Sequence, residues 1–326
     1  MPSCNKFILY LSKKDVECVG LTMPEIIGVL DVMFREKGEG RVEMPPKPGI
    51  HTRKDASIHA MPAYIPRMES AGMKWVSGYP ENNKKGLPHI SGLIILNDPE
   101  TGLPMAVMDA TWITAKRTGA ATAVAAKYLA RKESSSVGIL ACGVQGRSNL
   151  EALACLFKLT KVKVFDSQPE IAQRFAREMA ETAGAGIEVA GHPKDAVKGM
   201  DLVVTSGPIL KDPTPVIEAD WLSEGAFASP VDFDSYWKGS ALKQADKLAT
   251  DDIGQMDYYR QAGYFKDTPR PYADLGDIVA GKAPGRERDG ERTISINLGV
   301  APCDIATAIL VYRKAREMRI GTDLPL

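Results

Sequence analysis

Hydrophobic and polar positions in the first third of the chain predict one helix followed by several strands. Thr22-Met23-Pro24-Glu25 forms a capping-box pattern, and the apolar residues after it are spaced as on one buried helix face. The first helix is therefore expected to begin there. The Pro- and Gly-rich stretch 44–53 is expected to be a loop. Apolar runs at 93–96 and 105–108 flank the turn-rich link Asn97–Gly102, which predicts a β-hairpin in an α+β domain.

After residue 118 the pattern changes to alternating helices and strands. The Ala-rich segment 118–130 predicts a closely packed helix. The alternation beyond it predicts parallel strands with crossover helices, as in a doubly wound α/β sheet. The expected strands are 137–140, 162–165, 187–190 and 202–205, with 226–231 and 294–296 as further candidates, and the expected helices are 149–159, 169–183 and 305–319.

Composition narrows the functional class. With 326 residues the chain is long enough for two domains, and none of its apolar runs approaches the roughly 20 residues that span a bilayer. The 41 basic and 41 acidic side chains balance, so a small-molecule partner is favoured over nucleic acid or membrane. The first ten residues lack a signal-peptide pattern, and we expect a cytoplasmic protein.

Cysteine and histidine spacing argues against a disulfide framework and a metal site. The five cysteines (Cys4, Cys18, Cys142, Cys155, Cys303) never form a Cys-x-x-Cys pair, and we expect reduced thiols. The four histidines lack the i, i+4 spacing of a helical metal pair, so no metal is expected.

A candidate nucleotide loop lies at Gly138–Gly146, between a predicted strand and a predicted helix. There a Gly-x-Gly-x-x-Gly loop cradles a pyrophosphate on backbone N–H groups and the helix dipole. Ala141 occupies the first glycine position, which leaves an ordinary strand-to-helix turn as an alternative. Asp166 ends the next strand at the position of the acid that binds the adenosine ribose, although a strand-end cap would also explain it.

The surroundings of Asp166 favour NAD(H) over NADP(H). A carboxylate repels a 2′-phosphate, and Ser167-Gln168 supplies no arginine to neutralise one. The segment Thr205-Ser206-Gly207 follows another strand and is expected to line the cofactor crevice.

The chain resembles the ornithine cyclodeaminase/mu-crystallin family, which includes alanine dehydrogenases and imine reductases. The order and spacing of several blocks carry the resemblance over nearly the whole chain: Met61–Tyr64, Lys74 with Pro80–Asn82, Asp98–Gly102, Thr114–Thr118, Gly143–Gln145 with Arg147, Leu275–Lys282, and Gly299 with Asp304. The family implies a homodimer with a smaller substrate-binding and dimerisation domain (1–118 plus 305–326) and a Rossmann-type NAD-binding domain (119–304). The expected cofactor-binding residues are Thr118, Cys142, Gly143, Val144, Gln145, Asp166, Thr205 and Ser206.

By motif position, Arg117 resembles the family arginine that grips the substrate carboxylate, and Lys74 resembles the lysine beside the reacting carbon. A guanidinium matches a carboxylate bidentately, and an ammonium can protonate a substrate nitrogen. A salt bridge is the alternative for Arg117, and a solvated strand residue is the alternative for Lys74.

The chain departs from the family pattern at further candidate positions. Lys47 stands where the family has a second carboxylate-binding arginine, which keeps the charge but loses the planar fork. His89 is interpreted as a donor to a second carboxylate or a proton relay, with a loop-capping histidine as the alternative. For the family's cleft aspartate, Asp234 is the nearest match and Asp232 the second choice, and both could instead be exposed turn acids.

The resemblance leaves three functions open. The first is an NAD(H)-dependent imine reductase or amino-acid dehydrogenase, with a dicarboxylic imine as one substrate class. The second is an ornithine or lysine cyclodeaminase that recycles its NAD. The third is a non-catalytic nucleotide- and ligand-binding protein, which the presence of both Lys74 and Arg117 disfavours.

Overall fold

The computed structural model describes residues 7–326 and divides the chain into two compact units, 1–117 with 300–326 and 118–299. The junctions lie within α3 (Thr111–Leu129) and just before α10 (Ala301–Met318). The return to the first unit therefore begins five residues earlier than the sequence suggested, because α10 already starts at Ala301. Cys4 lies outside the described residues.

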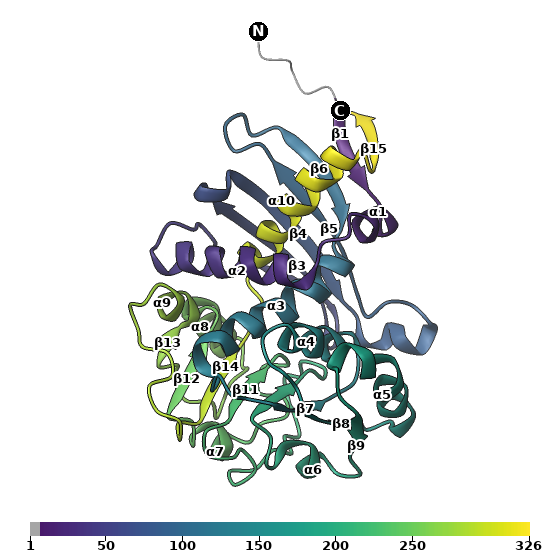
Figure 1. The fold of residues 1–326 in the computed structure, drawn as a ribbon. Helices are drawn as coiled ribbons and strands as arrows, with labels where there is room; N and C mark the ends of the chain where they lie inside the picture. Colours follow the sequence, from purple (N-terminus) through teal and green to yellow (C-terminus); the bar gives the residue numbers. More distant parts are fainter. Residues whose placement is uncertain (1–6) are drawn as a thin grey trace. The chain divides into compact units, whose positions relative to one another are not determined.

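The first unit is a mixed seven-stranded sheet with helices packed on it (Figure 1). Its strand order is β15-β1-β6-β5-β4-β3-β2, in which β1 and β6 are parallel and the other neighbours are antiparallel. Its elements are β1 (Phe7–Leu11), α1 (Lys13–Cys18), α2 (Met23–Gly38), β2 (Gly49–Arg53), β3 (Ala56–Ile65), β4 (Ser70–Gly78), β5 (Ile90–Asn97), β6 (Pro104–Asp109), α10, β15 (Thr322–Pro325) and two short 3₁₀ helices (Pro66–Met68, Pro80–Lys85).

Helix α10 packs on β3, β4 and β5 and against α2. The side chains buried between these elements form the core of this unit. Gly72 on β4 permits this packing. A Cβ atom there would lie 2.3 Å from the Ile95 carbonyl oxygen and 3.2 Å from the Ile305 side chain of α10. The absence of a side chain at Gly72 therefore brings α10 close to the middle of β4.

The second unit is an eight-stranded, all-parallel sheet in the order β13-β12-β14-β11-β10-β7-β8-β9. Strands β7, β10, β11, β12 and β14 are buried along their whole length, as expected for parallel strands covered on both faces. The elements are β7 (Ser136–Leu140), α4 (Val144–Ala154), β8 (Lys161–Phe165), α5 (Pro169–Ala183), β9 (Ile187–Val189), α6 (Pro193–Val197), β10 (Leu202–Thr205), β11 (Phe227–Pro230), α7 (Gly239–Leu242), β12 (Lys247–Thr250), α8 (Ile253–Gln261), β13 (Ala273–Asp274), α9 (Leu275–Val279) and β14 (Thr293–Ile296).

The predicted fold class, an α/β Rossmann-type sheet with a smaller α+β part, is confirmed. The capping box at Thr22 and Glu25 is present, and β5 and β6 form the predicted hairpin. Helix α5 and strand β10 have the predicted bounds.

Several local predictions were wrong in the order or the bounds of an element. The helix at Met23 is the second, because β1 and α1 precede it. The end of the stretch expected to be a loop is β2, which pairs with the neighbouring strand β3 in an antiparallel hairpin, from Gly49 opposite His59 to Arg53 opposite Ala56. Helix α3 begins at Thr111, where the Asp109 carboxylate accepts the Thr111 N–H at 2.9 Å. Helix α4 covers Val144–Ala154 rather than 149–159, since Gly143 is its N-cap.

Candidate active site

Three charged side chains meet in the interior of the first unit. Lys74 on β4 places its Nζ 2.7 Å from Oδ2 of Asp304, and Nε of Arg117 donates to Oδ1 of the same carboxylate at 2.9 Å. Lys74, Asp304 and Arg117 are 1%, 0% and 6% exposed, respectively. Lys74 also lies 3.5 Å from Oγ1 of Thr114, one helical turn before Arg117 on α3. The structure thus brings the two predicted cations together through one shared carboxylate.

Burial dominates the electrostatics of Lys74. Desolvation lowers its pKa to about 7, the charges of Arg117 and Lys47 lower it as well, and the Asp304 carboxylate opposes the shift. An amine with a pKa near neutrality can give up and regain a proton at physiological pH, whereas an ordinary lysine stays charged. Lys74 is therefore suited to proton transfer.

The other two cations expected in this unit lie differently. Lys47 is half-buried just before β2, and its charge reaches Lys74. His89 lies between the second 3₁₀ helix and β5, where burial lowers its pKa and its carbonyl oxygen accepts the Tyr79 N–H. His89 is not among the charges that perturb Lys74. Lys47 thus acts on Lys74 through its charge, whereas among the described residues no hydrogen bond or ion pair links the His89 side chain to this group.

Sequence reasoning gave no role to His59 or Asp304, although both belong with this group. His59 is two residues from Met61, the register partner of Lys74, so it lies on the same face of the sheet as Lys74. Burial, followed by the charges of Lys47, His51 and Lys74, lowers the pKa of His59 to about 4. Asp304 could have been noticed as a lone acid in the apolar start of α10.

The candidate nucleotide loop has the features that an anion needs. Gly143 is the N-cap of α4 and supplies no side chain to the first-turn N–H groups, so these groups can bind a phosphate. A Cβ at Gly146 would lie 2.6 Å from the Ala141 carbonyl oxygen, which shows how closely the helix approaches the turn. Ala141 adopts a φ of 71°, the left-handed conformation that glycine usually supplies. Of the predicted loop residues, Val144 is 65% exposed, and Gln145 lies in the first turn of α4.

Asp166 follows β8 and holds the loop from the next strand. Its carboxylate accepts the N–H of Cys142 at 2.8 Å and that of Gln168 at 3.0 Å. Burial, together with the negative charge of Asp166, raises the pKa of the Cys142 thiol to about 12, so this cysteine stays neutral. These residues fit the ribose and pyrophosphate of a dinucleotide.

The turn after β10 is joined to the same loop. The Ser206 hydroxyl donates to the Ala141 carbonyl oxygen at 2.9 Å. Thr205 donates to the Asp232 carboxylate at 2.8 Å and accepts from the Trp237 indole at 3.0 Å, while the Gly207 N–H donates to Asp232 at 2.9 Å. Thr118, the remaining predicted cofactor residue, is buried in α3.

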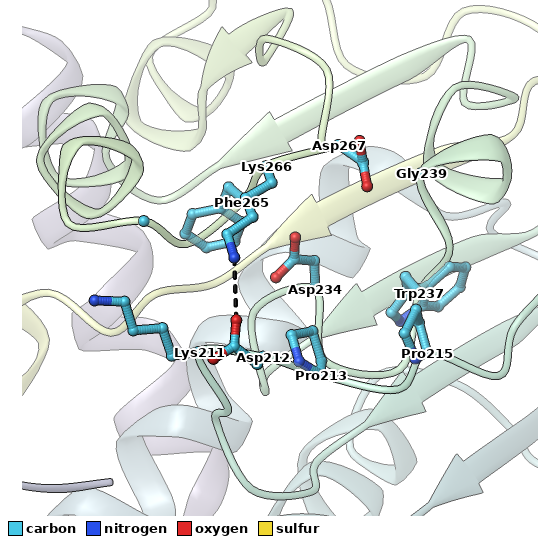
Figure 2. Close-up of a pocket in the computed structure, with 11 residues that line it drawn as sticks. Lys211, Asp212, Pro213, Pro215, Asp234, Trp237, Gly239, Phe265, Lys266 and Asp267 are labelled. Atoms are coloured by element: carbon cyan, nitrogen blue, oxygen red, sulfur yellow. Dashed lines mark hydrogen bonds and ion pairs between the residues drawn. The ribbon is translucent and has the colours of Figure 1, made fainter. Parts of the chain in front are cut away.

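The two candidate acids after β11 have different surroundings. Asp232 is fully buried and hydrogen-bonded into the turn, and its burial raises its pKa to about 7. Asp234 lines a cavity of about 230 Å³ (Figure 2). Its carboxylate accepts a hydrogen bond from Thr268 at 2.9 Å. Burial raises the pKa of Asp234, and the nearby Asp267 charge adds to the shift. Asp234 thus reaches a cavity, whereas Asp232 is enclosed by its own hydrogen bonds.

Neither a metal centre nor a membrane helix is evident in the described part of the chain. Residues 7–326 contain no group of three or more His, Cys, Asp or Glu side chains arranged to hold a metal ion. None of the helices in this range combines the length and apolar composition that crossing a bilayer requires.

Comparisons with known proteins agree with this architecture. Alanine dehydrogenase from Archaeoglobus fulgidus is 36% identical over 325 residues, covering 97% of this chain and 98% of that protein. Thermococcus litoralis Δ1-pyrroline-2-carboxylate reductase, solved with NADH and L-proline, is 34% identical with a TM-score of 0.88, covering 97% of this chain and all of that one. An archaeal alanine dehydrogenase dimer with bound NAD is 35% identical, also with a TM-score of 0.88, covering 98% and 99% of the two chains.

The family model described as ornithine cyclodeaminase/mu-crystallin matches residues 9–319, nearly the whole described chain. That range contains both the Lys74–Asp304–Arg117 cluster and the nucleotide loop at Gly143. The chain therefore belongs to the ornithine cyclodeaminase/mu-crystallin family.

Proposed function

We propose that the protein is an NAD(H)-dependent oxidoreductase that reduces the C=N bond of a small imino acid, or oxidises the corresponding amino acid. The observation that carries the proposal is the buried Lys74, whose Nζ lies 2.7 Å from the carboxylate that also binds Arg117. The relatives named above are an alanine dehydrogenase and an imine reductase, which act on such substrates.

NADH held by the first turn of α4 and Asp166 would supply the hydride for the imine carbon. The electron pair of the C=N bond then passes to the nitrogen, and the Lys74 ammonium donates the proton that completes the amine. Lys74 is left neutral and regains its proton from water. Arg117 binds the substrate carboxylate and orients the imine. In the oxidative direction the neutral Lys74 amine accepts the proton.

The cofactor proposal is NAD(H) in preference to NADP(H). The acid at Asp166 fits the ribose hydroxyls and repels a 2′-phosphate, and the first turn of α4 is open to the pyrophosphate. NADH and NAD are the cofactors bound in the two solved relatives.

We extend the proposal to substrates with two carboxylates. Lys47 and Arg117 both lie close enough to lower the pKa of the buried Lys74, and His59 lies on the same sheet face. One substrate carboxylate needs only one of the two cations Lys47 and Arg117, and with Arg117 on the first carboxylate, Lys47 would bind the second. Lys47, His59 and Arg117 would then set the substrate preference.

We also propose a homodimer formed through the sheet face opposite to Lys74. Register pairing places Trp75 beside Leu93 on that face, and both side chains are more than 40% exposed. Tyr10, 39% exposed, lies on the same face because β1 pairs with β6 and β6 with β5. Exposed apolar surface of this kind usually marks an interface, and the archaeal alanine dehydrogenase is a dimer.

The test is NADH oxidation by the purified protein. The panel combines ammonia with 2-oxo acids bearing one or two carboxylates, and adds cyclic imino acids, each measured with NADH and NADPH. We expect substrate-dependent oxidation of NADH, faster than that of NADPH, and a preference for dicarboxylates. Lack of turnover with every substrate would refute the oxidoreductase proposal. Ammonia release from ornithine or lysine without net change in NADH would instead assign the cyclodeaminase reaction.

A further inference from the structure

Asp304 is the point where the two cations of the candidate site meet. Each of its carboxylate oxygens contacts a different partner, Oδ2 the Lys74 ammonium and Oδ1 the Arg117 guanidinium. Because both oxygens belong to one rigid group, the spacing between the two cations is set by the carboxylate. The contact on Arg117 is at Nε, which fixes the plane of the guanidinium.

The backbone holds Asp304 in this position. It is the fourth residue of α10, and its neighbour Ile305 packs over Gly72 on β4. Gly72 and Lys74 are two residues apart and therefore lie on the same face of the strand. The close approach of α10 to β4 at Gly72 thus brings the Asp304 carboxylate to the Lys74 ammonium.

The charge of Asp304 also controls the protonation of Lys74. Burial lowers the pKa of Lys74 to about 7, and the positive charges of Arg117 and Lys47 act in the same direction. Asp304 acts against these effects through its charge and its contact with Nζ. Without it the Lys74 pKa would fall further, so that less of the lysine would carry a proton at neutral pH.

We propose that Asp304 is a positioning residue of the imine-reducing site: it fixes the proton donor Lys74 relative to the carboxylate-binding Arg117 and keeps Lys74 protonated. This inference rests on the proposed function. In this proposal Asp304 acts on the reaction through Lys74 and Arg117, the two side chains that it contacts. Its role is therefore visible in the pH dependence of the reaction and in its recovery by another acid.

The test compares Asp304→Asn and Asp304→Glu with wild type in the reductive assay from acid to alkaline pH. The kcat/KM profile reports ionisation of the free enzyme, and activity that needs the Lys74 ammonium falls as the pH rises through its pKa. We expect Asp304→Asn to move this alkaline limb to lower pH by about one unit or more and to lower kcat/KM roughly 10²-fold at neutral pH. Asp304→Glu keeps the negative charge, so the alkaline limb of its kcat/KM profile should stay near that of wild type.

Glu36→Gln is the matched control. Glu36 is another buried carboxylate of the first unit, 1% exposed and ion-paired with Arg41 and Arg67. Its loss should lower the thermal midpoint while leaving the alkaline limb in place. A shift of the limb equal to that of Asp304→Asn would mean that the effect comes from general destabilisation and would overturn the proposal.

The outcomes separate the role of Asp304 from the proposed function. No turnover by wild type refutes the function, whereas active wild type with an unchanged Asp304→Asn profile refutes only the role of Asp304. If Asp304→Asn does not fold, Asp304→Glu decides alone. Displacing the carboxylate by one methylene should lower kcat/KM at least about tenfold with the limb unmoved, and wild-type kcat/KM in this variant would overturn the proposal.

Discussion

The buried acid Asp232 should make the stability of the protein depend on pH. Its carboxyl is fully buried, and burial raises its pKa from 3.8 to about 7, although hydrogen bonds from Gly207 and Thr205 favour the ionised form. In the unfolded chain the pKa returns to its ordinary value. Between these two values the folded protein binds a proton that the unfolded chain does not, so stability falls as the pH rises through this window.

The size of this loss in stability follows from the linkage between proton binding and folding. From about pH 5 to pH 8 the loss is on the order of 3 kcal/mol, at 1.36 kcal/mol for each unit of pKa difference. For a domain of 150–250 residues each kcal/mol corresponds to roughly 2–4 °C in the thermal midpoint. Asp232→Asn removes the titration, and its amide can accept from Gly207 while donating to Thr205.

The assay is the thermal midpoint of both proteins across this pH range, because other titrating groups cancel in the difference. Wild type should lose about 6–12 °C relative to Asp232→Asn between acid and alkaline pH. Asp234→Asn serves as the control, since Asp234 is only partly enclosed and lines a cavity. If the thermal midpoints of wild type and Asp232→Asn change with pH in parallel, the stability of the protein does not depend on the protonation of Asp232, and the prediction is refuted.

Three further predictions concern the proposed function. Lys74→Met should lower kcat for imine reduction by roughly 10²–10⁴-fold because no proton donor remains, while NADH affinity measured by fluorescence titration stays the same. Asp166→Ala should weaken NADH binding about 10- to 100-fold in the same titration and leave NADPH binding less affected, since the ribose loses a charged acceptor. Trp75→Lys should convert the proposed dimer to monomer in sedimentation experiments, whereas Leu156→Lys, a change at an exposed leucine of the second unit, should not. An unchanged kcat for Lys74→Met, an equal loss of NADH and NADPH binding for Asp166→Ala, or the same oligomeric state for Trp75→Lys and Leu156→Lys would contradict the corresponding assignment.

Features that depend on residues close together in the chain were predictable from the sequence. The Thr22 capping box depends on residues three apart, and the loop before α4 depends on a strand, a turn and a helix in succession. Asp166 was found because the spacing from the loop to the end of the next strand is nearly constant in such folds. The alternation of strands and helices likewise specified the parallel sheet.

Features that depend on distant pairing were not predictable. Asp304 lies 230 positions from Lys74 in the chain, and only the packing of α10 on β4 brings them together. Strand β2 was missed for another reason: it pairs locally with the neighbouring β3, but the Pro- and Gly-rich stretch that contains it is typical of a loop. The choice between Asp232 and Asp234 also required the structure, because neighbouring acids in one loop differ in burial only through their tertiary surroundings.

Lys74 and Asp232 show that burial alone does not identify a catalytic group. Desolvation brings the pKa of both to about 7, downward for the lysine and upward for the acid, because it penalises the charged form of each. Asp232 accepts hydrogen bonds from a backbone N–H and a threonine hydroxyl, and these bonds stabilise a turn. Lys74 instead faces a carboxylate shared with Arg117, an arrangement that keeps two cations side by side at considerable electrostatic cost. Buried ion pairs of this kind add little to stability, which agrees with the proposal that Lys74 and Arg117 serve an anionic substrate.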